Sequence, residues 1–235
     1  MYKYETHCHT SPVSLCAKAS PRDILELYKS MGYDGVFLTN HFIDGNIGGD
    51  RTRPYEEQLE FYFTDYDDAV EIGKEIGIKV FFGVELSYGG TDFLIYGLDK
   101  DWYRKNPQIM DMKKSEELQF MMDEGALVIQ AHPYRQASYI DHIRLYPNCV
   151  HGVEVINSAR TDFDNEMAIH YAKQYNLLEF AGSDTHSAER DRKFAGMCGE
   201  NPISSEKEFI EAVKNKELKI FHTGGILKWK QISWK

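Results

Sequence analysis

The sequence predicts an α/β protein folded as a closed or nearly closed (β/α) barrel. Short apolar segments alternate with amphipathic stretches of about 10 to 20 residues, an order that calls for parallel strands joined by crossover helices. Seven such strand segments, with little sequence to spare between the units, fit a barrel better than an open sheet. The 235 residues suffice for one core, so we expect a single domain spanning residues 1–235. Neither G-x-G-x-x-G nor G-K-[ST] occurs, which also disfavours a nucleotide-binding open sheet.

Each predicted strand is short and apolar and is bounded by glycine, proline or polar residues. Residues 93–98, reached through Gly89 and Gly90, are expected to form an added antiparallel partner. The parallel strands are expected at residues 2–9, 35–39, 79–86, 126–131, 152–156, 179–181 and 219–221.

The predicted helices carry start and stop signals. Ser20 is a typical N-cap, Pro21 suits the first helical position, and Gly32 lies just past the end of that helix. A long helix over residues 56–76 stops at Gly77. The remaining helices are expected at residues 110–124, 137–145, 162–176 and 205–215.

Composition and charge argue against several classes of protein. With 42% hydrophobic and 27% charged residues the chain is ordinary for a globular protein. Its longest apolar runs fall far short of the roughly 20 residues that cross a membrane. The first residues lack an apolar signal-peptide region, so we expect a cytoplasmic protein with no membrane partner. The net charge of −10, without a lysine/arginine cluster, disfavours long nucleic acid as a partner. The four cysteines form no C-x-x-C pair, which disfavours a zinc finger or a disulfide framework.

Side chains of the metal-binding type follow the predicted strands. Two pairs of them have i, i+2 spacing, which directs both side chains to one face of an extended segment. In a parallel barrel the C-terminal strand ends share one rim, where such barrels build their active sites. The residues at these ends are His7, His9, His41, Glu85, His132, Asp184 and His186.

Seven ligands are more than one tetrahedral ion can use, which predicts a centre of two or three divalent ions with a bridging carboxylate. Imidazole and carboxylate without thiolate suit zinc, manganese or iron. Scattered structural histidines would have no reason to gather at strand ends in this way.

Five motifs together resemble those of the PHP (polymerase and histidinol phosphatase) superfamily. They are H-x-H-T at residues 7–10, T-N-H at 39–41, G-V-E at 83–85, A-H-P at 131–133 and G-S-D-T-H at 182–186. The motifs occur in order over most of the chain. The resemblance implies a PHP domain with a distorted seven-stranded, TIM-like barrel, two or three divalent ions, and hydrolysis of phosphoesters by a metal-activated water.

The resemblance also assigns roles to the residues at the strand ends. It implies three ion positions: a first held by His7, His9, Glu85 and Asp184, a second by Glu85 and His132, and a third by His41 and His186. It makes Glu85, Asp184 and His186 the candidate catalytic residues.

Two segments depart from the family pattern. Residues 14–17 hold no carboxylate where the family often places a third-ion ligand, and residues 91–97 hold no histidine after the bridging glutamate. Asp92 is a possible substitute, although an acid at a strand start is more often solvated. Cys16 is either a soft ligand near the rim or an ordinary loop cysteine.

Two arginines at the same rim are candidate substrate-binding residues. Arg135 follows His132 and Arg160 follows the next strand, and a guanidinium binds phosphate through two parallel hydrogen bonds. For each, simple solvation is the alternative.

We therefore expect a phosphoesterase acting on a small phosphorylated metabolite or nucleotide. The alternatives are a nuclease for short oligonucleotides and a non-catalytic metal-binding PHP module. The sequence leaves the oligomeric state open.

Overall fold

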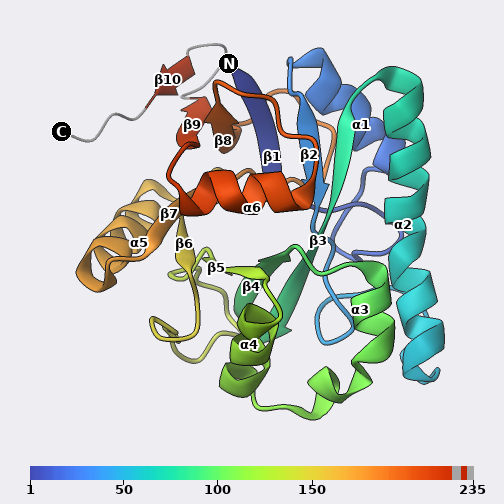
Figure 1. Ribbon diagram of the computed structural model, residues 1–235. Helices are drawn as coiled ribbons and strands as arrows, with labels where there is room; N and C mark the ends of the chain where they lie inside the picture. The colour runs from blue at the N-terminus through green and yellow to red at the C-terminus, as the bar shows by residue number, and fades with distance from the viewer. Residues whose placement is uncertain (224–228, 232–235) are drawn as a thin grey trace.

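The computed structural model, which describes residues 1–223 and 229–231, shows one mixed sheet curled into a nearly closed barrel with helices around it (Figure 1). Within these residues the hydrogen-bonded order of the strands is β10-β9-β8-β1-β2-β3-β4-β5-β6-β7. The strands are β1 (Tyr2–Cys8), β2 (Gly35–Leu38), β3 (Lys79–Tyr88), β4 (Thr91–Tyr96), β5 (Leu127–Ala131), β6 (Gly152–Asn157), β7 (Leu178–Gly182), β8 (Ala195–Gly199), β9 (Lys219–Thr223) and β10 (Trp229–Gln231).

The barrel wall consists of β1 to β7. Strands β1, β2 and β3 pair in parallel, as do β5, β6 and β7, whereas β4 is antiparallel to both of its neighbours. The wall closes just past the ends of β1 and β7, where the backbone N–H of His9 donates to the carbonyl of Thr185 at 2.8 Å. Closure at this end brings the residues that follow β1 and β7 side by side.

The prediction of a mixed α/β, nearly closed barrel is confirmed, but the regular seven-stranded (β/α)7 count is not. The segment expected as an added antiparallel strand is β4, which belongs to the wall between β3 and β5. The segment expected as a seventh parallel strand is β9, which pairs antiparallel with β8 outside the barrel. Strand β8 was not predicted, because its small residues, two of them glycine, hide its strand character.

Most helices begin and end where the sequence predicts. They are α1 (Pro21–Ser30), α2 (Tyr55–Ile76), α3 (Lys100–Lys105), α4 (Lys114–Asp123), α5 (Asp162–Tyr175) and α6 (Glu206–Lys214). Ser20 and Asp23 form a reciprocal capping box at the start of α1, and Gly77 ends α2 in the left-handed region at φ 74°. Helix α3 and the 3₁₀ turn Pro107–Asp111 were not predicted.

The helix predicted over residues 137–145 is wrong. This segment lies in the long loop between β5 and β6 and packs against the β3–β4 turn instead of covering the sheet with an apolar face. Ile140 contacts Gly90, and the Arg144 guanidinium donates to the carbonyl of Gly89 at 2.7 Å. Tertiary contacts to the neighbouring hairpin therefore replace the local hydrogen bonds of a helix.

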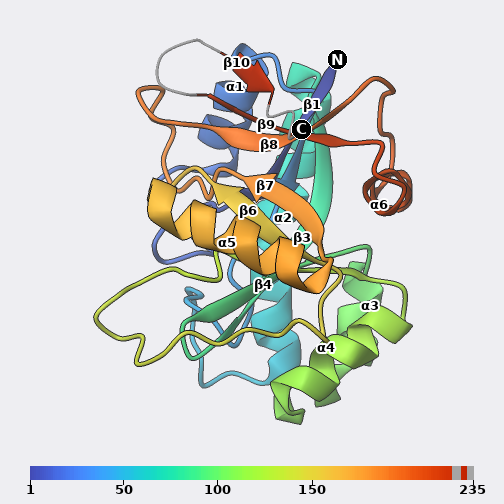
Figure 2. The same ribbon diagram turned by 90° about the vertical axis from the view of Figure 1, so that its left-hand side faces the viewer.

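Helix α6 lies across the barrel at the end opposite the loop between β5 and β6 (Figure 2). Its Phe209 is fully buried, with its ring centroid 4.3 Å from Phe37, 6.4 Å from Tyr4 and 6.1 Å from Phe180. These partners come from β1, β2 and β7, so one aromatic side chain fills the end of the barrel that α6 covers. The polar rim at the other end is left as the open face.

In the described part of the chain, no helix combines the length and the apolar character that crossing a bilayer requires.

We predict that Phe209→Ala lowers the free energy of unfolding by about 3–5 kcal/mol, because it leaves a cavity at the junction of three strands. Urea denaturation followed by circular dichroism measures this change. Phe163→Ala is the matched control, since Phe163 on α5 is 59% exposed and its truncation should change stability by no more than about 0.5 kcal/mol. Equal effects of the two substitutions would contradict the assignment of Phe209 as the plug.

Candidate metal centre

The predicted ligands converge inside the barrel at its polar rim, the end opposite α6. His7 lies in β1 and His9 just past it, and both side chains are fully buried in the barrel. The intervening Cys8 points the other way, into the core beneath α1. The i, i+2 spacing therefore places two imidazoles on one face, as predicted.

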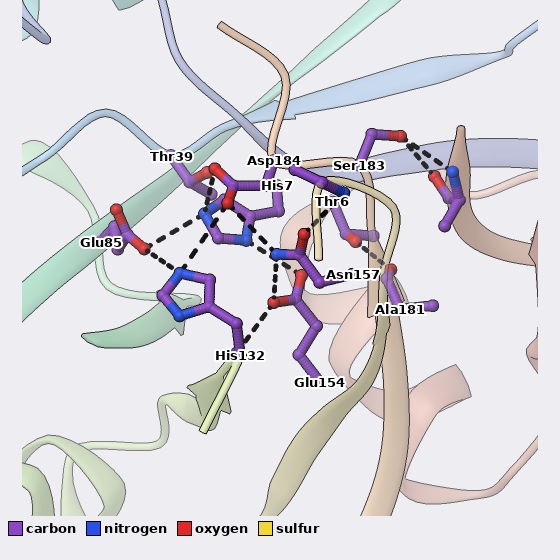
Figure 3. A network of polar contacts seen from close by, with 12 residues as sticks. Thr6, His7, Thr39, Glu85, His132, Glu154, Asn157, Ala181, Ser183 and Asp184 are labelled. Atoms are coloured by element: carbon purple, nitrogen blue, oxygen red, sulfur yellow. Dashed lines mark hydrogen bonds and ion pairs between the residues drawn. The ribbon is translucent and has the colours of Figure 1, made fainter. Parts of the chain in front are cut away.

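The carboxylate of Glu85, on β3, lies between four imidazoles. Two of them, His7 and His132, are seen beside it in Figure 3. Its Oε1 is 3.2 Å from His7 Nε2 and 3.4 Å from His132 Nε2. Its Oε2 is 2.7 Å from His41 Nδ1 and 3.5 Å from His9 Nε2. The residue predicted to bridge two positions is thus the one that touches ligands of both.

Asp184 closes the centre from the other side, just past β7. Its Oδ1 lies 3.6 Å from His7 Nε2 and 3.5 Å from both His9 Nε2 and His186 Nδ1. Its Oδ2 lies 3.9 Å from His132 Nε2. All seven predicted ligands are therefore brought together in one cluster, and five of them line the cavity above it: His41, Glu85, His132, Asp184 and His186.

Backbone strain marks two of these residues. Four non-glycine residues of the described chain have positive φ; Asn176 and Lys216 lie at the ends of α5 and α6, where such a conformation is usual. The other two are His132 at φ 24° and Asp184 at φ 53°. Strain of this kind concentrates at functional sites, where the surrounding structure enforces a particular side-chain direction.

The donor set and its geometry fit divalent ions. His7 Nε2, His9 Nε2, His41 Nδ1 and both oxygens of Glu85 are buried and have no hydrogen-bond partner within the described residues. Tetrahedral coordination with metal–ligand bonds of about 2.0–2.1 Å implies separations of about 3.3 Å between ligand atoms. The spacings around Glu85 cluster near this value. Three of them, at 3.2, 3.4 and 3.5 Å, match the separation of co-ligands of one ion, and the fourth, 2.7 Å to His41 Nδ1, is shorter.

The potential ligand atoms form three overlapping groups, each compact enough for one ion. The groups are His7, His9 and Asp184; His7, Glu85 and His132; and His9, His41 and His186. The third group differs from the implied assignment because His9 joins His41 and His186. That group consists of three neutral donors without a carboxylate of its own.

Cys16 and Asp92, whose roles the sequence left open, both line the cavity. Burial would raise the pKa of the Cys16 thiol, but hydrogen bonds from His186 and His41 outweigh it and lower the pKa to about 6. Asp92 Oδ2 lies 2.8 Å from the Arg135 guanidinium and 3.8 Å from His132 Nε2. Asp92 is thus buried and paired, not solvated.

The charges in the cavity shift the titration of its groups. Burial alone would raise the pKa of Glu85, but the facing His41 and His7 hold it well below its usual range. Burial would lower the pKa of His7, but Glu154, Asp184 and Glu85 raise it well above the ordinary value. Burial and the neighbouring His186 and His41 hold the pKa of His9 well below that value, so His9 is a neutral donor.

The predicted substrate-binding arginines flank the same cavity, which measures ≈ 680 Å³. The guanidinium of Arg160 lies 3.7 Å from Asp184 Oδ2, and that of Arg135 pairs with Asp92. The Nε donors of both arginines are buried and have no hydrogen-bond partner within residues 1–223 and 229–231. Both arginines line the cavity, so their guanidinium groups face an anion bound there.

Two residues that orient the ligands were missed in the sequence. Glu154, on β6, accepts from His7 Nδ1 at 2.9 Å. The Ser14 hydroxyl donates to Asn40 Oδ1 and lies 3.2 Å from His9 Nδ1, from which it can only accept. A charged residue within the apolar segment Gly152–Asn157 was the one available signal for Glu154.

Fold and site together define a distorted α/β barrel that carries a buried histidine–carboxylate centre of the metal-binding kind. A family model described as PHP-associated matches residues 162–218, the part of the chain that includes Asp184 and His186. This match covers only part of the chain, and it agrees with the resemblance to the PHP superfamily that the sequence motifs carry. A search of curated proteins gives no match.

Solved structures share the fold at low sequence identity. A two-domain protein from Bacteroides vulgatus, containing a predicted PHP-like metal-dependent phosphoesterase, aligns with a TM-score of 0.68 and 18% identity over 93% of this chain and 64% of that protein. The chain thus spans less than two thirds of that protein's length. A proposed metal-dependent phosphoesterase from Bifidobacterium adolescentis aligns with a TM-score of 0.56 and 14% identity over 89% of this chain and 95% of that one. An amidohydrolase from Chromobacterium violaceum, solved with bound sulfate and no metal, aligns with a TM-score of 0.52 and 14% identity over 90% of this chain and 96% of that one.

We predict that the protein, after reloading with zinc or manganese and desalting, retains at least two ions per chain, because its ligand atoms form three overlapping groups. Elemental analysis against protein concentration measures the ratio. Glu85→Ala should lower it to about one or less, since Glu85 borders more than one position. Asp65→Asn, which alters a buried carboxylate bonded to Thr10 and Val13, should leave it unchanged. Less than about half an equivalent in the wild type would rule out the centre.

We predict that thermal stability falls with rising pH in the metal-free protein and that zinc removes this fall. His7 and His41 have raised pKa values, so their contribution is present below the ordinary histidine value of 6.5 and is lost as pH rises through the raised values. The metal-free protein should therefore lose thermal stability as pH rises above 6.5. Zinc should remove this decline, because deprotonated imidazoles bind the ion more tightly. Melting temperatures in chelator and in zinc test this, and a metal-free melting temperature that stays level or rises over that range would refute it.

Proposed function

We propose that this protein is a metal-dependent hydrolase that cleaves a small phosphoester. The observation that carries the proposal is that Glu85, which lies between four imidazoles, lines the same cavity as the guanidinium groups of Arg135 and Arg160. Cationic forks beside a metal centre suit a phosphoryl group, which needs charge neutralisation at several oxygens. The metal-dependent phosphoesterases among the structural neighbours support this class of reaction.

Each residue has a distinct part in the proposed reaction. His7, His9, His41, Glu85, His132, Asp184 and His186 would hold two or three divalent ions, with zinc, manganese or iron as the candidates. Such ions, when bound, supply an activated water and a Lewis-acid clamp for the phosphoryl oxygens. Arg135 and Arg160 orient the ester through hydrogen bonds to its remaining oxygens. Asp184 lies beside Arg160, and both Asp184 and His186 line the cavity, where they can accept a proton or hold the reacting group.

The cavity favours a small substrate. Its volume of ≈ 680 Å³ lies within the range of about 300–1,000 Å³ typical of small-molecule sites. The net charge of −10 counts against a nuclease that tracks a long strand. A cytoplasmic phosphorylated metabolite or nucleotide is the substrate class we propose.

Hydrolysis of an amide is the second candidate, because one structural neighbour is an amidohydrolase. The two candidates differ in their need for cationic forks, since a neutral amide gains little from two guanidinium groups. A panel of phosphomonoesters, dinucleotides, short single strands and N-acyl amides, assayed with zinc and with manganese, separates them. Turnover of amides alone would exclude the phosphoesterase, and turnover of none would favour a non-catalytic metal-binding module.

We predict that Asp184→Ala lowers kcat/KM for p-nitrophenyl phosphate by about a thousandfold or more, because the carboxylate serves the ions that activate water. Arg135→Ala and Arg160→Ala should each cost about 10², the scale of lost phosphate positioning. Arg22→Ala is the arginine control, since Arg22 pairs with Glu75 on the outer surface and should not affect turnover. Asp184→Ala activity within about tenfold of the wild type would place the chemistry elsewhere.

A further inference from the structure

Glu154 has no part in the proposed reaction, yet it lies fully buried directly behind the centre (Figure 3). Its Oε1 accepts from His7 Nδ1 at 2.9 Å. Its Oε2 accepts from the backbone N–H of His132 at 3.0 Å and from Asn157 Nδ2 at 2.8 Å. A buried carboxylate is costly unless its oxygens are satisfied, and here both of them bond to the metal centre or its immediate neighbours.

The orientation of the donors around Glu154 is fixed by their other bonds. Asn157 Oδ1 accepts from the backbone N–H of Ala159 at 2.9 Å, so its amide nitrogen must face Glu154 Oε2. The same nitrogen lies 3.3 Å from Asp184 Oδ2. Two donors thus occupy Oε2, and Oε1 remains as an acceptor for His7.

We propose that Glu154 is a positioning residue that keeps the proton of His7 on Nδ1 and so leaves Nε2 free for the metal. His7 Nε2 then faces Glu85 Oε1 at 3.2 Å and Asp184 Oδ1 at 3.6 Å. A carboxylate behind a ligating imidazole fixes its tautomer and ring orientation and makes the imidazole a stronger donor. The proposal rests on the metal centre of the proposed function, not on the identity of the substrate.

Glu154 also ties the first ion position to the second. The backbone of His132 lies in the left-handed region at φ 24°, and its N–H is held by Glu154. Through Asn157 the same carboxylate reaches Asp184. Loss of Glu154 therefore releases one imidazole directly and two further ligands through their supports.

A comparison within the barrel separates this role from that of an ordinary buried carboxylate. Glu5, on β1, is equally buried, and its Oε1 accepts from the backbone N–H groups of Thr6, His7 and Ser183. A glutamine at position 5 can offer its oxygen to these donors and turn its NH₂ to the side where Oε2 has no hydrogen-bond partner in the described chain. A glutamine at position 154 cannot do the same, because both sides face donors. In one orientation its NH₂ opposes His132 and Asn157; in the other it donates to His7 Nδ1 and moves the proton to Nε2.

The experiment uses zinc alone and no substrate. Zinc affinity is measured by competition with a chromophoric chelator for the wild type, Glu154→Gln and Glu5→Gln. We expect Glu154→Gln to weaken the tightest site by about 10- to 100-fold and Glu5→Gln to change it by less than about twofold. Equal affinities of all three proteins would overturn the role of Glu154 while leaving the metal centre intact.

Long-range ¹⁵N–¹H spectra of the zinc-loaded wild type give a test that needs no variant to fold. The His7 ring should carry its proton on Nδ1, and a proton on Nε2 would overturn the proposal. If the wild type binds no zinc, the centre and this inference fail together. If zinc binds as expected but no phosphoester is cleaved, the proposed reaction fails and the role of Glu154 stands.

Discussion

The polar end of the barrel, opposite α6, depends on one constraint: the buried carboxylate of Glu85 must be stabilised between four imidazoles. Its two oxygens lie 2.7–3.5 Å from histidine nitrogens, yet they form no hydrogen bonds with the described residues. In the metal-free chain, protonated His41 and His7 stabilise this charge and hold the pKa of Glu85 low. Bound divalent ions would stabilise the buried charge of Glu85 in place of the protons on His41 and His7.

The fold serves this constraint through closure at one end and a plug at the other. The bond between His9 and Thr185 draws the ends of β1 and β7 together, which brings the His-x-His pair against Asp184. At the opposite end, Phe209 of α6 fills the space between strands. The end of the barrel beneath α6 is thus apolar and tightly packed. The polar groups lie at the opposite rim, which is formed by the residues that follow the parallel strands.

The sequence predicts what depends on spacing and strand ends, and it misses what depends on contacts across the barrel. His7, His9 and Glu85 were recognisable because alternation and strand ends place them on the rim without knowledge of their partners. Glu154 was not, because its function follows from donors contributed by β1, β5 and β6 together. The helix expected over residues 137–145 failed for the same reason: contacts of Ile140 and Arg144 with the β3–β4 turn decide its conformation. The antiparallel direction of β4 was predicted, but its place in the wall between β3 and β5 is a property of pairing, which a single segment does not encode.

The two histidines of the opening motif are supported unequally, and this asymmetry bears on the order of the ion positions. His7 is backed by the charged Glu154, whereas His9 is backed by the neutral hydroxyl of Ser14. A charged acceptor makes the imidazole a stronger donor than a hydroxyl does. His7 belongs to the two groups that include a carboxylate, whereas the third group joins His9 to His41 and His186 only. The two ion positions that include a carboxylate are therefore also the ones whose ligand His7 is backed by the charged Glu154. The third position has only imidazole donors, so its remaining ligands must come from Cys16 beside it or from an anionic group of the substrate.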